Sequence, residues 1–102
     1  MMTMTQCAQL AGVDADVARA ATPTPEHRAL YRSYLLNLRL GDAAVERLIR
    51  RDLHGWVDLG AHAKAAGALV ALRWFWTDFP QVAPCVGERR APPALRAACG
   101  AA

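Results

Sequence analysis

The stretch over residues 56–80 constrains this chain most, because an alanine-rich helix runs there into a dense group of aromatic residues. Trp74, Phe75 and Trp76 are consecutive, and Phe79 follows about one helical turn later. Successive residues of a helix are rotated by about 100°, so three adjacent rings spread over roughly 200° of its surface. One buried helix face is narrower than that. We therefore expect the segment to be central to the core, wrapped by the tail, or part of an interface.

Length and composition favour one small helical domain. The chain has 102 residues, and 54% of them are hydrophobic, with alanine supplying a large share. Alanine favours helices and lets them approach closely. The larger apolar residues cluster between Leu30 and Phe79, where we expect the core. We predict a single helical domain over residues 1–80 and a Pro/Gly/Ala-rich tail over residues 81–102, with room for one short helix at 94–99.

Apolar spacing and helix-end signals predict the elements. We expect a short helix over residues 5–21 and a second over 25–40, with Thr24 as its N-cap and Pro25 as its first residue. Gly41 ends that helix, and a third begins near Asp42. A fourth helix is expected over residues 61–77, with Asp58 as a plausible cap. The predicted fold class is all-α, a compact array or bundle of three to five helices.

Cysteine usage and hydropathy predict a cytoplasmic protein without a membrane segment. Cys7, Cys85 and Cys99 are an odd set without close pairing, which is typical of free thiols in a reducing compartment. The N-terminal residues lack the basic start and apolar run of a signal peptide. The most apolar window, residues 65–76, is too short for a bilayer and is interrupted by Arg73.

No local pattern predicts catalysis, a metal or a cofactor. The chain has no nucleophile motif, no glycine-rich phosphate loop and no carboxylate pair in an apolar setting. His54, Asp58 and His62 are spaced by four, but on one helix the two histidines would be about 12 Å apart. We interpret them as surface histidines flanking a cap. We accordingly expect no enzyme, no metal or cofactor and no small-molecule substrate.

The leading hypothesis is a non-enzymatic interaction or regulatory protein. Its partner is expected to be another macromolecule or a second copy of the chain. The aromatic-rich helix is the predicted interface, because tryptophan and arginine are enriched where binding energy concentrates. One of its two tryptophans is expected in the core and the other on the surface as an anchor. The predicted partner-binding residues are Arg73, Trp74, Trp76 and Phe79.

The alternative hypothesis is a DNA-binding transcriptional regulator. The formal net charge is +3 and the isoelectric point is about 9.1, a balance that permits a nucleic-acid partner without requiring one. The basic residues of two successive helices could form one cationic surface or two ordinary solvated faces. The candidate nucleic-acid contacts are Arg19, Arg28, Arg32, Arg47, Arg50 and Arg51.

The N-terminal sequence CAQLAGVDADVARAA resembles the start of bacterial repressor DNA-binding units such as those of the LacI type. Ala8 and Gly12 are four residues apart, as are the small residue and turn glycine of that motif. The resemblance implies two short helices, the second lying in the major groove. Asp14 and Asp16 depart from the pattern by placing carboxylates at the groove-facing start, with Arg19 as the cation of the segment. A short capping helix with an Ala-Gly turn stays the other interpretation. The apolar positions of the motif correspond to Cys7, Ala11, Val13 and Ala18.

Residues 59–75, LGAHAKAAGALVALRWF, are similar in part to the opening of a MerR-type winged helix-turn-helix. One residue is missing after the turn glycine, which rotates the following arginine and aromatics by about 100°. We predict one uninterrupted alanine-rich helix instead. The similar positions are Gly60, Ala63, Lys64, Gly67 and Arg73.

Overall fold

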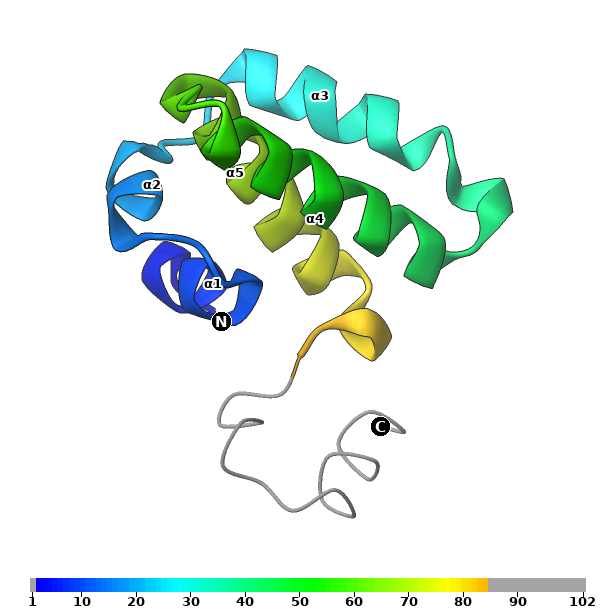
Figure 1. Cartoon of the computed structure of the whole chain (residues 1–102). Helices are drawn as coiled ribbons and strands as arrows, with labels where there is room; N and C mark the ends of the chain where they lie inside the picture. Colours follow the sequence, from blue (N-terminus) through cyan, green and yellow to red (C-terminus); the bar gives the residue numbers. More distant parts are fainter. Residues whose placement is uncertain (1, 85–102) are drawn as a thin grey trace, which may run out of the picture.

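The computed structural model describes residues 2–84, and within that range the protein is an array of five α-helices without strands (Figure 1). The predicted all-α class is confirmed. Two short 3-10 turns, η1 and η2, follow the third and fifth helices. The short helix predicted at residues 94–99 lies outside the described range. The helices are α1 (Met4–Ala11), α2 (Ala15–Ala20), α3 (Pro25–Leu35), α4 (Asp42–Asp58) and α5 (His62–Asp78); the turns are η1 (Leu38–Leu40) and η2 (Pro80–Val82).

The N-terminal segment forms two helices, not the single helix predicted over residues 5–21. Thr3 caps α1 in a reciprocal box with Gln6: the Gln6 N–H donates to Thr3 Oγ1 at 3.1 Å, and the Thr3 N–H donates to Gln6 Oε1 at 2.9 Å. Gly12 then ends α1 with φ of +77°, a left-handed conformation that glycine adopts without strain. Asp14 Oδ1 accepts the Asp16 N–H at 2.9 Å and starts α2.

The second predicted helix begins as expected but ends five residues early. Thr24 Oγ1 accepts the His27 N–H at 3.2 Å, and Pro25 occupies the first turn. After Leu35 the chain tightens into η1 instead of continuing to residue 40. Leu36 is 76% exposed and Leu40 is 61% exposed, so no core surface supports a longer helix there. Apolar spacing alone could not show where that surface ends.

The two longest helices, α4 and α5, have 17 residues each. Asp58 is the last residue of α4 and does not cap α5, which corrects the prediction. The N-cap of α5 is Ala61, and it forms no side-chain cap hydrogen bond. Because the chain turns at residues 59–61, His54 and His62 belong to different helices.

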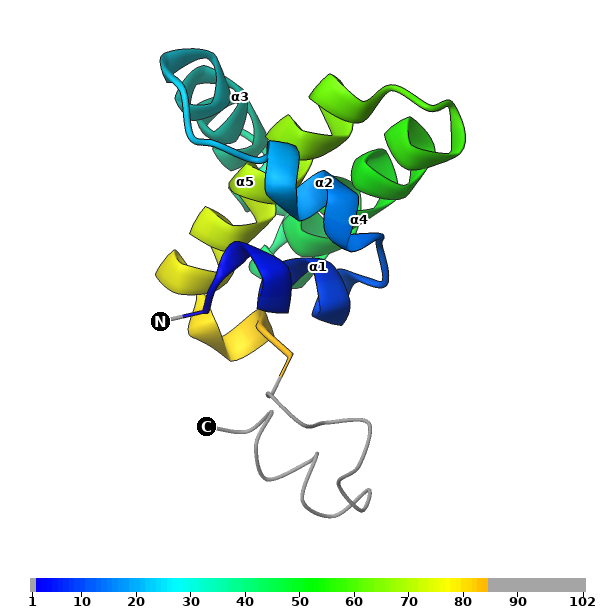
Figure 2. The ribbon, with the colours of Figure 1, turned by 90° about the vertical axis from the view of Figure 1, so that its left-hand side faces the viewer.

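Helix α5 is the central element of the fold (Figure 2). It contacts α1, α2, α3, α4 and η2, and its residues 65–72 are all buried, together with Phe75 and Trp76. A helix that is apolar all round is expected to be enclosed by others. The first of the three alternatives for the aromatic segment, a central position in the core, is therefore the observed one. The uninterrupted helix also replaces the turn that the MerR-type similarity would require.

Two tyrosines of α3 link it to its neighbours through carboxylates. Tyr31 Oη donates to Asp78 Oδ2 at the end of α5, and Tyr34 Oη donates to Asp52 Oδ2 of α4 at 2.7 Å. Burial, followed by the hydrogen bond to the carboxylate, raises the pKa of each phenol above its usual value of 10.0. These two hydrogen bonds fix the orientation of α3 over the α4–α5 pair.

Candidate functional site

The aromatic residues predicted as an interface divide between the core and the surface. Trp76 is 3% exposed, which makes it the core member of the tryptophan pair. Trp74 is half-buried, with the Arg28 guanidinium 4.2 Å from its ring centroid and the Tyr31 ring 5.7 Å away. Phe79 is also half-buried, and its ring stacks on that of buried Phe75 at 4.5 Å. Trp74 stays a candidate anchor, but a cation already covers one face of its ring.

Arg73, the fourth residue of the predicted interface, is half-buried and engaged within the chain. Its Nε–H donates to the Met2 carbonyl oxygen at 2.8 Å, which joins α5 to the segment before α1. Its positive charge also acts on the nearby Cys7 thiol, although burial of that thiol dominates and raises its pKa to about 12. The structure thus gives Arg73 an internal, positioning role.

The arginines predicted to contact nucleic acid are dispersed over three helices. Arg19 pairs with Asp16 on α2, and Arg28 lies over Trp74 on α3. Arg50 binds the buried Glu46 carboxylate through two hydrogen bonds, of 3.0 and 2.6 Å. Arg47 and Arg51, one turn apart on α4, are exposed and line the same two pockets. Exposed Arg32 lies on α3.

The α1–α2 pair has the two-helix arrangement that the repressor resemblance implies. Ala8 is fully buried beneath the turn, and Gly12 reverses the chain between the helices. The second helix has six residues, and Arg19 is ion-paired with Asp16. Asp14 also stands at its start, so its solvent-facing side carries more carboxylate than guanidinium charge. That balance opposes the approach of phosphates.

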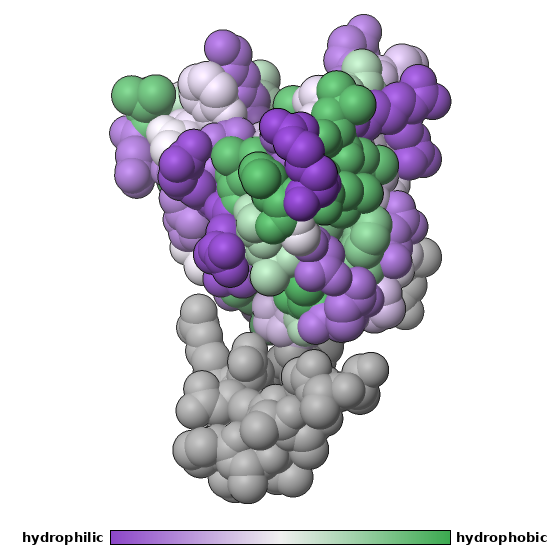
Figure 3. Space-filling view, turned by 90° about the vertical axis from the view of Figure 1, so that its right-hand side faces the viewer, coloured by the Kyte–Doolittle hydropathy of each residue, from purple (hydrophilic) through white to green (hydrophobic). Residues whose placement is uncertain are grey.

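The most prominent exposed apolar surface of the described chain is one that the sequence reasoning missed. It lies on the connector between α3 and α4, where Leu36, Leu38 and Leu40 are 76%, 36% and 61% exposed. Figure 3 shows the side of the molecule that carries this connector, with apolar residues gathered in the middle and polar ones around them. The signal in the sequence is the leucine-rich run LLNLRL, which helical spacing assigns to the predicted helix over residues 25–40.

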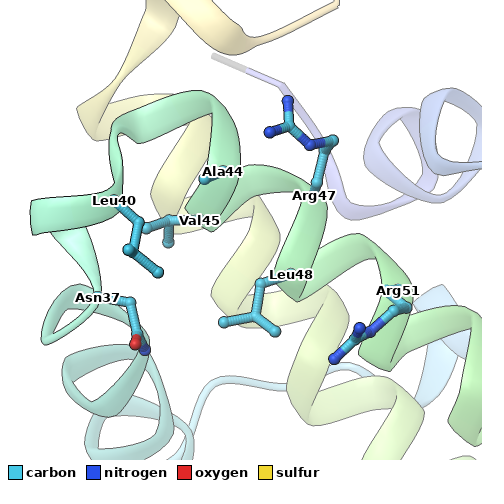
Figure 4. A pocket seen from close by; sticks show the side chains of 7 residues that line it. All are labelled: Asn37, Leu40, Ala44, Val45, Arg47, Leu48 and Arg51. Atoms are coloured by element: carbon cyan, nitrogen blue, oxygen red, sulfur yellow. The ribbon is translucent and has the colours of Figure 1, made fainter.

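A groove of about 400 Å³ lies beside this connector, and we call it the leucine groove. Leu40 from η1 and Leu48 from α4 face its interior, and Arg47 and Arg51 stand on its α4 side (Figure 4). Its lining, as far as the described residues show, contains two guanidinium groups and no carboxylate. The arrangement suits an apolar side chain next to an anionic one. The lining residues are Asn37, Leu40, Ala44, Val45, Arg47, Leu48 and Arg51.

Residues 2–84 contain neither a cluster of potential metal ligands nor a helix that could span a membrane. No group of three or more histidine, cysteine, aspartate or glutamate side chains in that range is placed to hold a metal ion. No helix there is both long and apolar enough to cross a bilayer.

Comparison of the chain with protein families, with curated proteins and with solved structures finds no match.

Proposed function

We propose that this chain is a non-enzymatic interaction protein that binds another protein through the leucine groove and the connector leucines beside it. The observation that carries the proposal is that one short connector holds Leu36 and Leu40, both more than half exposed, and that Leu40 also lines a groove with apolar walls. A single exposed leucine is ordinary, but a cluster beside a groove with a polar rim marks interaction sites.

The proposal moves the interface away from the aromatic helix on which the sequence places it. Helix α5 already buries Phe75 and Trp76 against its neighbours, so self-association is not needed to cover these rings. The connector leucines have no such cover within the described chain. Their transfer out of water would contribute about 25 cal/mol for each Å² buried.

A photo-crosslinking amino acid tests this proposal directly. It is placed at Leu40 in one variant and at Ala20 in the matched control, and each is expressed at native level in the cells of origin. Ala20 is exposed on α2, across the molecule from the connector (Figure 1). A discrete protein adduct from position 40 but not from position 20 is the expected result. Equal labelling from both positions, or none, contradicts the proposal.

A DNA-binding regulator is the second candidate, and the α1–α2 unit with its Gly12 turn is the observation that favours it. Its test is the anisotropy of intrinsic tryptophan fluorescence as random duplex DNA is added at low and then moderate salt. Binding that weakens steeply with salt and is lost in Arg19→Glu would favour it. Binding that survives Arg19→Glu would move the contact to the arginines of α3 and α4. No binding at low salt would refute it.

A further inference from the structure

The leucine groove continues along α4 into a second hollow. This hollow has a volume of about 310 Å³ and is lined by Arg51, Asp52, Gly55, Trp56 and Leu59; we call it the glycine hollow. Arg51 lines both depressions, so they adjoin at that side chain. Leu59 at the far end is 76% exposed. The two depressions therefore follow one another along α4, with Arg51 lining both, and we call them together the track.

The track has the dimensions of a helix-binding site. Ala44, Leu48, Gly55 and Leu59 lie within roughly 60° of one another around α4, while the buried residues of α4 occupy another face. From Ala44 to Leu59 the helix rises about 22 Å, which equals about four helical turns. Arg51 and Asp52 occupy the turn between Leu48 and Gly55, so apolar anchors of a partner helix would meet the stripe towards its two ends and polar groups would meet its middle.

Gly55 supplies an independent reason to place a partner here. It is exposed within α4, and a Cβ atom built on it meets no atom within 4 Å. Glycine inside a helix costs about 0.5–1 kcal/mol relative to alanine, and no packing contact of the described chain requires it at this position. Its absent side chain instead allows a second backbone to approach α4 closely.

The charged side chains along the track indicate which kind of partner would bind. Arg47, Arg50, Arg51 and His54 follow one edge of the stripe, and Arg47 and Arg51 are exposed. On the opposite edge the Asp52 carboxylate accepts the hydrogen bond from Tyr34. Exposed Asp58 lies on the arginine edge near Leu59, so this edge is cationic over residues 47–54 and carries a carboxylate at its C-terminal end. A helix with carboxylates beside its apolar stripe is complementary to the cationic part of this edge.

We infer that the track binds an acidic amphipathic helix of about four turns from another protein; the inference rests on the proposed function and names its partner class. The chain's own residues 85–102 are a poorer match, because they contain one glutamate against three arginines. A second copy joined by a twofold axis would bring like-charged arginines together, which opposes association.

The inference is tested with three fluorescein-labelled peptides and the full-length protein. The first has about sixteen residues with leucines spaced at i, i+4, i+7 and i+11 and glutamates beside them. The second replaces every glutamate by lysine and keeps the leucines, and the third is residues 85–102. Binding is followed by fluorescence anisotropy at low and moderate salt. We expect the glutamate peptide to bind about ten-fold more tightly than the lysine peptide. The ratio of the two affinities should fall as the salt concentration rises.

Three variants locate the binding. Arg51→Glu should weaken the binding of the glutamate peptide about ten-fold and should strengthen the binding of the lysine peptide. Arg19→Glu makes the same change of charge on α2 and should alter neither affinity more than about two-fold. Gly55→Leu puts a side chain into the glycine hollow, where its Cβ atom meets no atom within 4 Å, and should weaken the binding of both peptides. Circular dichroism of each variant checks that the helices are retained.

Each contrary result has a defined meaning. Equal binding of both leucine peptides, lost in Gly55→Leu, would overturn the acidic partner and leave the proposed function standing. No binding of either peptide, or binding indifferent to Arg51→Glu and Gly55→Leu, would overturn the inference, and crosslinking from Leu40 would still decide the proposed function separately. Tight binding of the 85–102 peptide would assign the track to the chain's own tail. A concentration-dependent dimer disrupted by Gly55→Leu in sedimentation would assign it to a second copy.

Discussion

Two glycines inside the two long helices are predicted to respond in opposite directions to alanine. Gly55 of α4 faces open space, so Gly55→Ala should stabilise the fold by about 0.5–1 kcal/mol through helix propensity alone. For a domain of this size, that corresponds to a rise in melting temperature of about 3–6 °C. Gly67 of α5 is buried, and a Cβ atom there would lie 3.1 Å from Cδ2 and 3.3 Å from Nε2 of His27.

The cost at Gly67 follows from that contact. The His27 ring is half-buried and its Nδ1 atom is enclosed by the protein, so the ring has to shift by a few tenths of an ångström to admit the Cβ atom. Overpacking of this kind costs about 1–3 kcal/mol, which exceeds the propensity gain. Gly67→Ala should therefore lower the free energy of unfolding by about 1 kcal/mol. His27→Ala, which removes the obstructing ring, should turn Gly67→Ala from a loss into a gain, and a double-mutant cycle measures that coupling.

Urea denaturation of the single variants and of the double variant is the assay, with the midpoint and slope fitted for each. Equal stabilisation by Gly55→Ala and Gly67→Ala would refute the reasoning, since it would mean that α3 does not press on α5 at His27. Destabilisation by Gly55→Ala would equally refute the open environment assigned to that residue. An unchanged slope across the series confirms that the comparison concerns the same unfolding transition.

The remaining predictions concern buried groups. Because the folded state raises the pKa of the Tyr31 and Tyr34 phenols above 10.0, it binds their protons more tightly than the unfolded chain does, so stability should fall as the pH rises above about 10. Urea unfolding at pH 8 to 11 should show this loss, weakened in Tyr34→Phe; a pH-independent midpoint would contradict it. The Cys7 thiol is fully buried with a pKa of about 12, so in a variant whose other cysteines are serine it should react with a thiol reagent only as the protein unfolds. Rapid labelling of the native protein at neutral pH would disprove that. Trp76→Ala should cost about 3–5 kcal/mol and Trp74→Ala clearly less, measured by thermal unfolding followed by circular dichroism. Equal losses would contradict the division of the two rings between core and surface.

Some helix ends follow from the sequence because their causes are local. Thr24 and Pro25 start α3 as predicted, since a threonine oxygen can reach the first-turn N–H groups wherever the helix lies in the fold. Gly41 likewise separates two elements in both the prediction and the structure. The continuous alanine-rich α5 is predictable because propensity and apolar content agree along its length.

The helix ends that the sequence predicts wrongly depend on contacts between residues that are far apart in the chain. Nothing local distinguishes Leu35, which closes α3, from Leu36 and Leu40, which project into solvent. Their difference arises because helix spacing shows that a face is apolar but not how far the opposing surface extends. Asp58 fits a cap on local grounds and nevertheless closes α4.

The sequence by itself determined the helical class, most of the elements and the presence of more aromatic surface than one helix face can bury. Only the tertiary structure decided that α5 buries Phe75 and Trp76 among four helices, leaves Trp74 half-buried, and exposes the leucines of the connector between α3 and α4. The reason is physical. Composition and periodicity show which apolar side chains must be removed from water. Whether a given helix face packs against another helix or binds a partner depends on which helices meet in the fold.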